Sequence, residues 1–177
     1  MKVISTKFSG LKLIEANLFS DNRGYLREIF QKKRLNKNLI FHYFAKSKKN
    51  VFRGFHFQAK NQQEKLVSVL EGSIIDISID LRRNSKTFGK VFKVLLSEKN
   101  KKSIFIPKGF AHGYLSLDKS NLVYFKNSNY RDADQERGII WNDNDLNIKW
   151  SYKKPLISKK DKQNMSYKEF LKTYKSI

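Results

Sequence analysis

The chain contains no cysteine, and this absence removes several classes of protein at once. Without cysteine there is no disulfide framework, no thiolate ligand for zinc and no cysteine nucleophile. No apolar run approaches the ~18 residues of a membrane-spanning helix, and residues 1–8 contain no apolar signal core. We therefore expect a soluble cytoplasmic protein without a membrane partner.

Proline and glycine are scarce, with two and eight residues respectively. No segment resembles a Gly/Ser linker, so we predict one domain over residues 1–177, with residues 159–177 as a C-terminal tail. A chain of 177 residues is long enough to bury a core. Its 40% of hydrophobic residues is too high for a disordered chain.

Acidic residues are also few, since 37 Lys and Arg stand against 16 Asp and Glu, a net charge of +21. Such an excess is typical of proteins that bind nucleic acids or anionic membranes. Codon bias in an AT-rich genome would produce the same excess, and the lysines are dispersed rather than gathered in one block. We favour the second interpretation and predict no nucleic-acid partner, although a dispersed positive field would still attract a diphosphate substrate.

The middle of the chain has the pattern of successive short strands separated by turns. Residues 73–81 alternate between an apolar face and a mostly polar face, after a turn signal at Glu71-Gly72. Further strands are predicted at 65–70, 91–97, 103–106, 112–117 and 122–127. Many short strands with few helical patterns between them indicate an all-β antiparallel sandwich or barrel.

The tail from Lys159 to Tyr174 is more helix-like than the rest of the chain. Phe170, Leu171 and Tyr174 recur there at helical spacing, which is typical of a packing face.

Three histidines, His42, His56 and His112, are the obvious candidates for chemistry. There is no His-x-His pair, so we predict no metal site. Taken alone, each histidine fits a hydrogen-bonded core residue better than a catalyst. Arg53 and His56 are three residues apart, which places them on opposite faces of a flat strand unless Gly54 forms a bulge that re-aims one of them.

Five short motifs follow one another along the chain. They are Phe19–Tyr25 (FSDNRGY), Phe52–Gln58 (FRGFHFQ), Ser85–Gly89 (SKTFG), Ile106–Tyr114 (IPKGFAHGY) and Glu136–Asp143 (ERGIIWND). Their order and spacing resemble the dTDP-4-dehydrorhamnose 3,5-epimerase family from about residue 8 to residue 162. The resemblance implies a cupin-type antiparallel jelly roll that acts as a homodimer, without metal or other cofactor, on a nucleoside-diphosphate-linked 4-keto-6-deoxy sugar.

The chemistry of such a substrate accounts for the residue types. A C4 ketone acidifies the hydrogens on C3 and C5, so a base can remove one of them, and a proton then returns to the enolate from the opposite face. The resemblance implies that His56 is the base, that Asp161 is its carboxylate partner and that Lys65 faces the developing oxyanion.

The resemblance also assigns a set of residues to substrate binding. They are Arg23, Glu28, Arg53, Gln58, His112, Glu136 and Lys160. Arg23 and Glu28 lie on an N-terminal segment that in this family reaches the neighbouring subunit's site. In so basic a chain a single Lys or Arg can equally be a surface charge; this alternative is weakest for Lys65 and Arg53, which lie beside apolar or aromatic runs.

Two departures from the family pattern stand out. Where the family has a tyrosine general acid, an ungapped alignment places Phe125, which cannot donate a proton. Tyr124 would take its place only if a bulge turned it to the other face of the strand. The family also usually shows Gln-Asp-Asn where this chain has Phe41-His42-Tyr43. Those positions normally touch the substrate, so the identities of the sugar and the nucleotide stay open.

We predict an isomerase that epimerises C3, C5 or both in a nucleotide-linked 4-keto sugar for dTDP-rhamnose and surface-polysaccharide biosynthesis. With Phe125 in place of the acid, a 3,4-ketoisomerase or a single-carbon epimerase is an alternative, with water or Tyr130 as a slow donor. A non-enzymatic module that binds anions or nucleic acids through the +21 charge is a third possibility, and it leaves the motifs unexplained.

Overall fold

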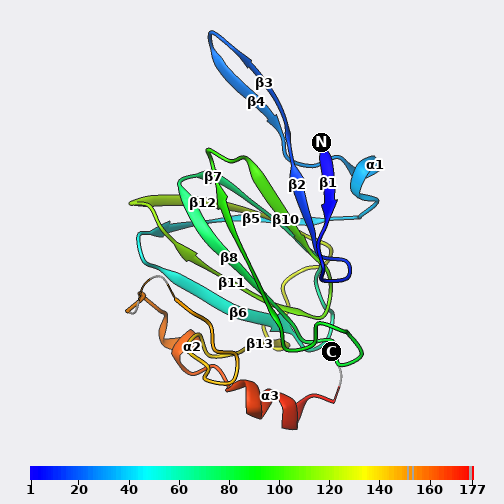
Figure 1. Ribbon diagram of the computed structural model, residues 1–177, viewed down its shortest axis with the longest axis vertical. Coiled ribbons are helices and arrows are strands. Elements are labelled where there is room, and N and C mark those ends of the chain that lie inside the picture. Colours follow the sequence, from blue (N-terminus) through cyan, green and yellow to red (C-terminus); the bar gives the residue numbers. More distant parts are fainter. Residues whose placement is uncertain (151, 153, 176) are drawn as a thin grey trace.

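Two antiparallel β-sheets lie face to face and form most of the protein (Figure 1). The computed structural model describes residues 1–150, 152, 154–175 and 177. Within these residues a six-stranded sheet contains, in spatial order, β1 (Lys2–Ser5), β2 (Lys12–Glu15), β10 (Lys102–Ile106), β7 (Lys65–Glu71), β12 (Ser120–Asn127) and β5 (Phe41–Lys48). A five-stranded sheet contains β13 (Glu136–Gly138), β6 (Phe52–Gln58), β11 (Phe110–Ser116), β8 (Ser73–Asp80) and β9 (Val91–Ser97).

The path of the chain between the two sheets is that of a jelly roll. From β5 to β13 consecutive strands change sheet at every step except between β8 and β9, and the strand pairs are antiparallel. This architecture confirms the predicted all-β antiparallel jelly roll, and each strand predicted from the alternation is present. None of the helices in the described part of the chain is long and apolar enough to cross a membrane.

Strand β8 has the predicted alternation, but both of its faces are buried. Asp76, Ser78 and Asp80 on the polar face are 0% exposed. The apolar face, with Ile77 and Ile79, packs against the C-terminal tail and not against the other sheet. The polar face is therefore the one that points into the space between the two sheets.

The motif at Ser85–Gly89 has a structural role in this arrangement. The buried Asp80 carboxylate accepts hydrogen bonds from Arg82 Nε and Nη2 (2.8 and 2.7 Å), Ser85 Oγ (2.6 Å) and Thr87 Oγ1 (2.6 Å). Burial raises the pKa of Asp80, but these hydrogen bonds outweigh it and hold the pKa below its ordinary value. The motif thus closes the turn after β8 around a buried charge.

The predicted helical tail forms two short helices, α2 (Lys159–Lys162) and α3 (Tyr167–Thr173), which lie along the outer side of the five-stranded sheet (Figure 1). Phe170 is 0% exposed, and its ring lies 5.6 Å from those of Phe57 and Tyr174. The predicted packing face is therefore confirmed, and it is this face that covers β6.

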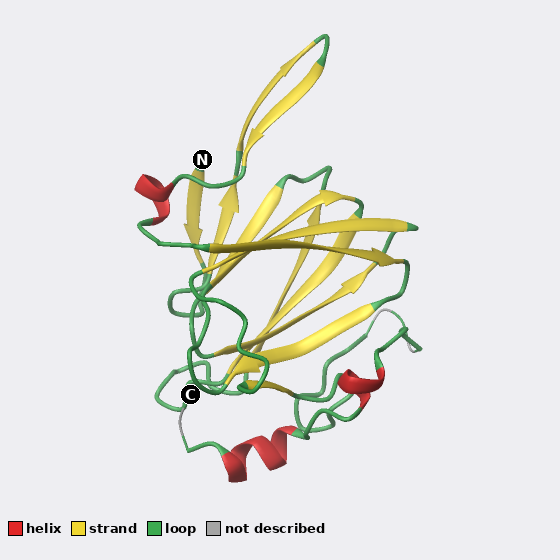
Figure 2. Cartoon of the chain, turned by 180° about the vertical axis from the view of Figure 1, so that it is seen from behind, coloured by secondary structure: helices red, strands yellow, loops and turns green. Residues whose placement is uncertain are grey.

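A two-stranded hairpin, β3 (Asn17–Asp21) and β4 (Gly24–Glu28), projects away from the sheets and is followed by the short helix α1 (Lys32–Leu35) (Figure 2). Arg27 fixes the base of the hairpin, because its guanidinium donates to the carbonyl oxygens of Val69 and Lys101 at 2.8 Å. The rest of the hairpin extends into solvent.

We expect Phe170→Ala to lower the free energy of unfolding by about 3–5 kcal/mol, the usual cost of deleting a buried aromatic ring. Urea denaturation measures this difference. Lys168→Ala is the matched control, because Lys168 is exposed on the same helix and its loss should change stability by less than about 0.5 kcal/mol. Equal effects of the two substitutions would contradict the role of α3 as the cover of β6.

Candidate active site

A cavity of about 640 Å³ opens between the two sheets. Its walls come from β5, β7 and β12 of one sheet, from β6, β11 and β13 of the other, and from the segment that enters α2. Nine of the sequence-predicted site residues line it: Arg53, His56, Gln58, Lys65, His112, Phe125, Glu136, Lys160 and Asp161. The expected site is thus assembled in one place, apart from the two residues of the N-terminal segment.

A bulge in β6 turns two of these residues into the same cavity. His56 pairs with His112 and Arg53 with Tyr114, so the register slips by one residue between them, which is the bulge that the sequence left open at Gly54. Gly54 has a φ of +132°, and a Cβ on it would lie 2.5 Å from the Cα of Gly113. Only glycine fits there, because the two strands approach too closely for a side chain.

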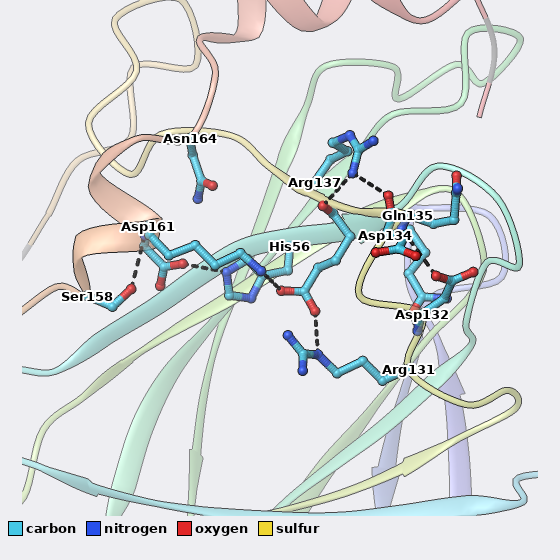
Figure 3. Close-up of polar contacts among 12 residues, drawn as sticks. His56, Arg131, Asp132, Asp134, Gln135, Arg137, Ser158, Asp161 and Asn164 are labelled. Carbon is cyan, nitrogen blue, oxygen red and sulfur yellow. Dashed lines mark hydrogen bonds and ion pairs between the residues drawn. The ribbon is translucent and has the colours of Figure 1, made fainter.

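The side chains of His56 on β6 and Asp161 in α2 point toward each other (Figure 3). His56 Nε2 lies 2.7 Å from Asp161 Oδ1, and the Gly54 amide donates to Oδ2 at 3.4 Å. Burial raises the pKa of Asp161, but the hydrogen bonds, that from His56 foremost, bring it below its ordinary value. Asp161 is therefore a carboxylate that accepts the Nε2 proton, so that in the neutral imidazole Nδ1 is the nitrogen with a free lone pair.

Ser158 holds Asp161 in this position. The Asp161 amide donates to Ser158 Oγ at 3.0 Å, which caps the N-terminus of α2.

Glu136 is held between two cations at the rim of the cavity. Arg131 Nε and Lys160 Nζ each donate to its carboxylate at 2.6 Å, and Figure 3 shows the Arg131 side chain reaching toward this group. Burial raises the pKa of Glu136, but the two hydrogen bonds and the neighbouring charges lower it to about 2. Glu136 is therefore a permanent anion that orients Arg131 and Lys160 and is unsuited to act as a proton donor.

Lys65 is the first residue of β7 and lines the cavity on the six-stranded sheet. Burial lowers its pKa to about 8, although the carboxylates of Glu136 and Asp76 act in the opposite direction. Its ammonium group is thus a poorly solvated charge at neutral pH, which is the kind of group that stabilises a nearby oxyanion.

His112 forms a second, deeper pair with Asp76. The distance from His112 Nε2 to Asp76 Oδ2 is 2.7 Å, and both side chains are almost completely buried. Asp76 Oδ1 has no hydrogen-bond partner among the described residues. Within the same part of the chain, no group of three or more His, Asp or Glu side chains is placed to hold a metal ion.

Two predicted binding residues are engaged with the protein itself. Gln58 donates to the Asn61 carbonyl at 2.7 Å and accepts from the Asp132 amide at 2.9 Å, so its amide fastens the loop that carries Arg131. Arg53 donates to Ser47 Oγ at 3.0 Å, which keeps its guanidinium at the edge of the cavity.

Phe125 faces the cavity, as the ungapped alignment predicted, and Tyr124 points to the other face of β12. The Tyr124 hydroxyl lies 3.4 Å from His42 Nδ1 on that outer face. The register shift in β12 falls between Leu122 and Val123 and does not move Tyr124 inward. The alternative in which a bulge brings Tyr124 into the site is therefore wrong.

Arg23 and Glu28 do not lie in this chain's cavity. Arg23 pairs with Asp21 at the exposed tip of the hairpin, and Glu28 accepts hydrogen bonds from Asn17 and Gln31 near its base. Their predicted role in a neighbouring subunit's site stays a prediction.

Several cavity residues have no role that the sequence predicted, namely Tyr114, Asn127, Arg131 and Gln63. Asn127 follows Phe125 by two residues on the same strand, so alternation along the predicted strand could have identified it. Arg131 lies in a loop after β12, and no periodic signal marks it.

A family model described as dTDP-4-dehydrorhamnose 3,5-epimerase matches residues 5–169. The enzyme of that name from Shigella flexneri is 39% identical over 169 residues, which are 91% of this chain and 93% of that protein. The one from Escherichia coli (strain K12) is 37% identical and covers 97% of both chains.

Solved structures agree with these relatives. The dTDP-4-dehydrorhamnose 3,5-epimerase of Bacillus anthracis, with TDP and PPi bound, superposes with a TM-score of 0.90 at 37% identity over 93% of this chain and 98% of that chain. The dTDP-6-deoxy-D-glucose-3,5-epimerase of Legionella pneumophila, in complex with dTDP-4-keto-L-rhamnose, gives 0.89 at 35% identity over 93% and 92%.

We expect Lys65 to react with acetic anhydride at a rate that rises with pH and levels off above a pKa of about 8, because only the neutral amine reacts and burial disfavours the charged form. Peptide mass spectrometry after brief labelling measures this profile. In urea the same lysine should titrate near ~10.4. Identical profiles for Lys65 in the folded and unfolded chain would show that its charge is not desolvated.

Proposed function

Because the chain belongs to the dTDP-4-dehydrorhamnose 3,5-epimerase family, a family of isomerases that act on carbohydrates, we propose that it inverts C3 and C5 of a dTDP-linked 4-keto-6-deoxy sugar. The observation that carries this proposal is the His56–Asp161 hydrogen bond of 2.7 Å in a cavity that Lys65 also lines. The ligand of the Legionella relative, a 4-keto sugar linked to dTDP, supports the substrate class. Such a product would supply a deoxysugar for surface polysaccharides.

In this proposal His56 is the base. With Nε2 directed to the Asp161 carboxylate, Nδ1 is the ring nitrogen that accepts a proton from C3 or C5. The carboxylate keeps the ring in that tautomer and stabilises the imidazolium that forms, which is the function of the acidic member of a catalytic triad.

Lys65 supports the same step from the other sheet. As the proton leaves, the C–H electron pair forms the C=C bond of the enolate and the carbonyl π pair moves to O4. An ammonium group in a poorly solvated cavity stabilises that charge far better than it would in water. Since the pKa of Lys65 is about 8, the ammonium form predominates below this pH.

The rim of the cavity suits a diphosphate. The cavity is lined by four cationic side chains, Arg53, Lys65, Arg131 and Lys160, against the two carboxylates of Glu136 and Asp161. Arginine matches phosphate oxygens in a bidentate fashion, and Glu136 holds Arg131 and Lys160 in place. This excess of positive charge favours an anionic substrate even without the dispersed charge of the surface.

We expect His56→Ala to abolish the entry of solvent deuterium at C3 and C5 of a dTDP-4-keto-6-deoxy sugar in D2O. Asp161→Asn should lower the rate by about 10²–10⁴-fold, the usual value of an oriented acid–base group, with the fold intact. NMR of the recovered sugar and circular dichroism of the variants provide the measurements. Near-normal deuterium entry with His56→Ala would contradict this mechanism. A ketoisomerised product from the wild-type protein would show that it is a 3,4-ketoisomerase and not an epimerase.

The projecting hairpin supports a homodimer with shared sites, which is part of the proposal. Phe19 and Leu26 on the hairpin are 58% and 61% exposed. An isolated two-stranded hairpin is marginally stable in water. Arg27 anchors the base of this hairpin to the sheet, so that the rest of it projects outward. A second copy of the chain would bury these apolar side chains and receive Arg23 and Glu28 near its cavity.

Complementation between a variant with weakened substrate binding and an inactive variant tests this arrangement, with activity measured at a substrate concentration well below the KM of the weakened variant. Arg23→Ala should weaken substrate binding by roughly 10–100-fold, the loss of a charged hydrogen bond, and His56→Ala should be inactive. Co-expression of the two chains should restore about a quarter of the wild-type activity, because half of the dimers are mixed and each mixed dimer has one intact site. If Arg23 served its own chain's cavity, every site would carry a defect and co-expression would restore nothing.

A further inference from the structure

Inversion requires a proton donor on the wall that faces His56. His56 belongs to β6 of the five-stranded sheet, so the face of the enolate opposite the base lies toward β5, β7 and β12 of the other sheet. Phe125 on β12 lines that wall, and its phenyl ring has no proton to give. Lys65 on the same wall is already assigned to the enolate oxygen.

Among the described residues, two phenols line the cavity, those of Tyr43 and Tyr114. Tyr114 is on β11, in the same sheet as His56. Its hydroxyl lies 3.1 Å from Ser47 Oγ, which Arg53 also contacts, so it belongs to the cluster that anchors Arg53. The Tyr114 hydroxyl reaches β5 of the other sheet, but it is engaged there with Ser47, so Tyr114 is less suited than a free phenol to deliver a proton.

Tyr43 lies on the correct wall. It is on β5, directly across from Phe125 in the strand pairing, and the two rings stack with centroids 4.8 Å apart and planes at 12°. Phe41 supports the Tyr43 ring from the side at 5.4 Å. Tyr43 is 37% exposed, so the ring is held in place while part of it remains open to the cavity.

The surroundings of Tyr43 suit a donor. Burial raises its pKa, and the nearby side chain of Asn127 only partly offsets that rise, so the phenol keeps its proton at neutral pH. Asn127 is 1% exposed, and neither of its amide atoms makes a hydrogen bond of good geometry within the described residues. Tyr43 lines the same cavity as Arg131, Glu136 and His56, so these groups border one space.

We propose that Tyr43 is the catalytic proton donor opposite His56, and that it supplies from β5 the phenol that Phe125 does not supply from β12. The assignment rests on the function proposed above. The enolate carbon takes the Tyr43 proton, its C=C π pair forms the new C–H bond, and the oxygen charge returns to the C4 carbonyl. The O–H electron pair stays on Tyr43 as a phenolate. Water then reprotonates the phenolate, and the His56 imidazolium loses its proton to solvent.

Moving the hydroxyl across the strand pair tests this role. The first variant is Tyr43→Phe, which keeps the stacked ring. The second is the double variant, which combines Tyr43→Phe with Phe125→Tyr and so returns a phenol to β12. In D2O, one assay follows deuterium entering the recovered substrate with retained configuration, and a second follows inverted product. The first reports His56 alone, because the same base can return a deuteron to the same face.

We expect Tyr43→Phe to lower inversion by about 10²–10⁴-fold, the value of general-acid assistance, while exchange with retention continues. The double variant should form inverted product at least roughly tenfold faster than Tyr43→Phe, since the hydroxyl moves only to the neighbouring strand. Tyr124→Phe is the matched control: its ring is on β12 but on the outer face, and both assays should match the wild type.

Three outcomes would overturn the assignment. Inversion by Tyr43→Phe at near the wild-type rate would do so. Tyr43 would only stack on the substrate if inversion and deuterium entry with retention fell equally. The same conclusion would follow from a higher KM with an unchanged ratio of these two rates. If the double variant formed inverted product no faster than Tyr43→Phe, the hydroxyl would not be the active group. A wild-type protein without any exchange would instead refute the proposed function itself, and the assignment with it.

Discussion

The docking of the C-terminal tail on the outer face of β6 is the constraint on which the rest of the structure depends. Phe170 of α3 closes over Phe57 on that face, and α2, the preceding helix of the same tail, brings Asp161 to His56 across 105 residues of sequence. Because the tail covers the apolar face of the five-stranded sheet, that sheet can turn polar side chains toward the interior without exposing a hydrophobic surface to water. The same tail thus contributes both to the stability of the fold and to the geometry of the His56–Asp161 pair.

The buried carboxylates of this polar interior form hydrogen bonds and ion pairs with other groups of the protein. Asp80 has hydroxyl and guanidinium donors, and Glu136 has two cations. Buried polar atoms without a partner are costly and rare in proteins. Three of those among the described residues, Asp76 Oδ1 and both side-chain amide atoms of Asn127, belong to the inner walls of the sandwich. A ligand that entered the cavity could offset part of this cost.

The two sheets contribute different parts of the site. The five-stranded sheet carries His56, His112 and Glu136, whereas the six-stranded sheet carries Lys65 and the aromatic layer of Tyr43 and Phe125. In the proposed reaction a planar enolate between them would present one face to each sheet, so the sandwich would let a proton leave from one face and return to the other. The bulge at Gly54 adds the last element, because it brings Arg53 to the same side as His56.

The sequence by itself determined the strands, because alternation of period two follows from the pleat of each strand, and it determined most of the site through motifs whose order resembles a known family. It correctly placed Phe125 and not Tyr124 on the cavity face, for the same reason of alternation. Only the tertiary structure decided that the polar face of β8 points inward, since the tail that covers its other face lies about 80 residues further on. It also decided that Tyr43 stacks on Phe125. Local pattern tells which face of a strand a residue occupies, whereas the partner across the strand depends on register and on the packing of distant segments.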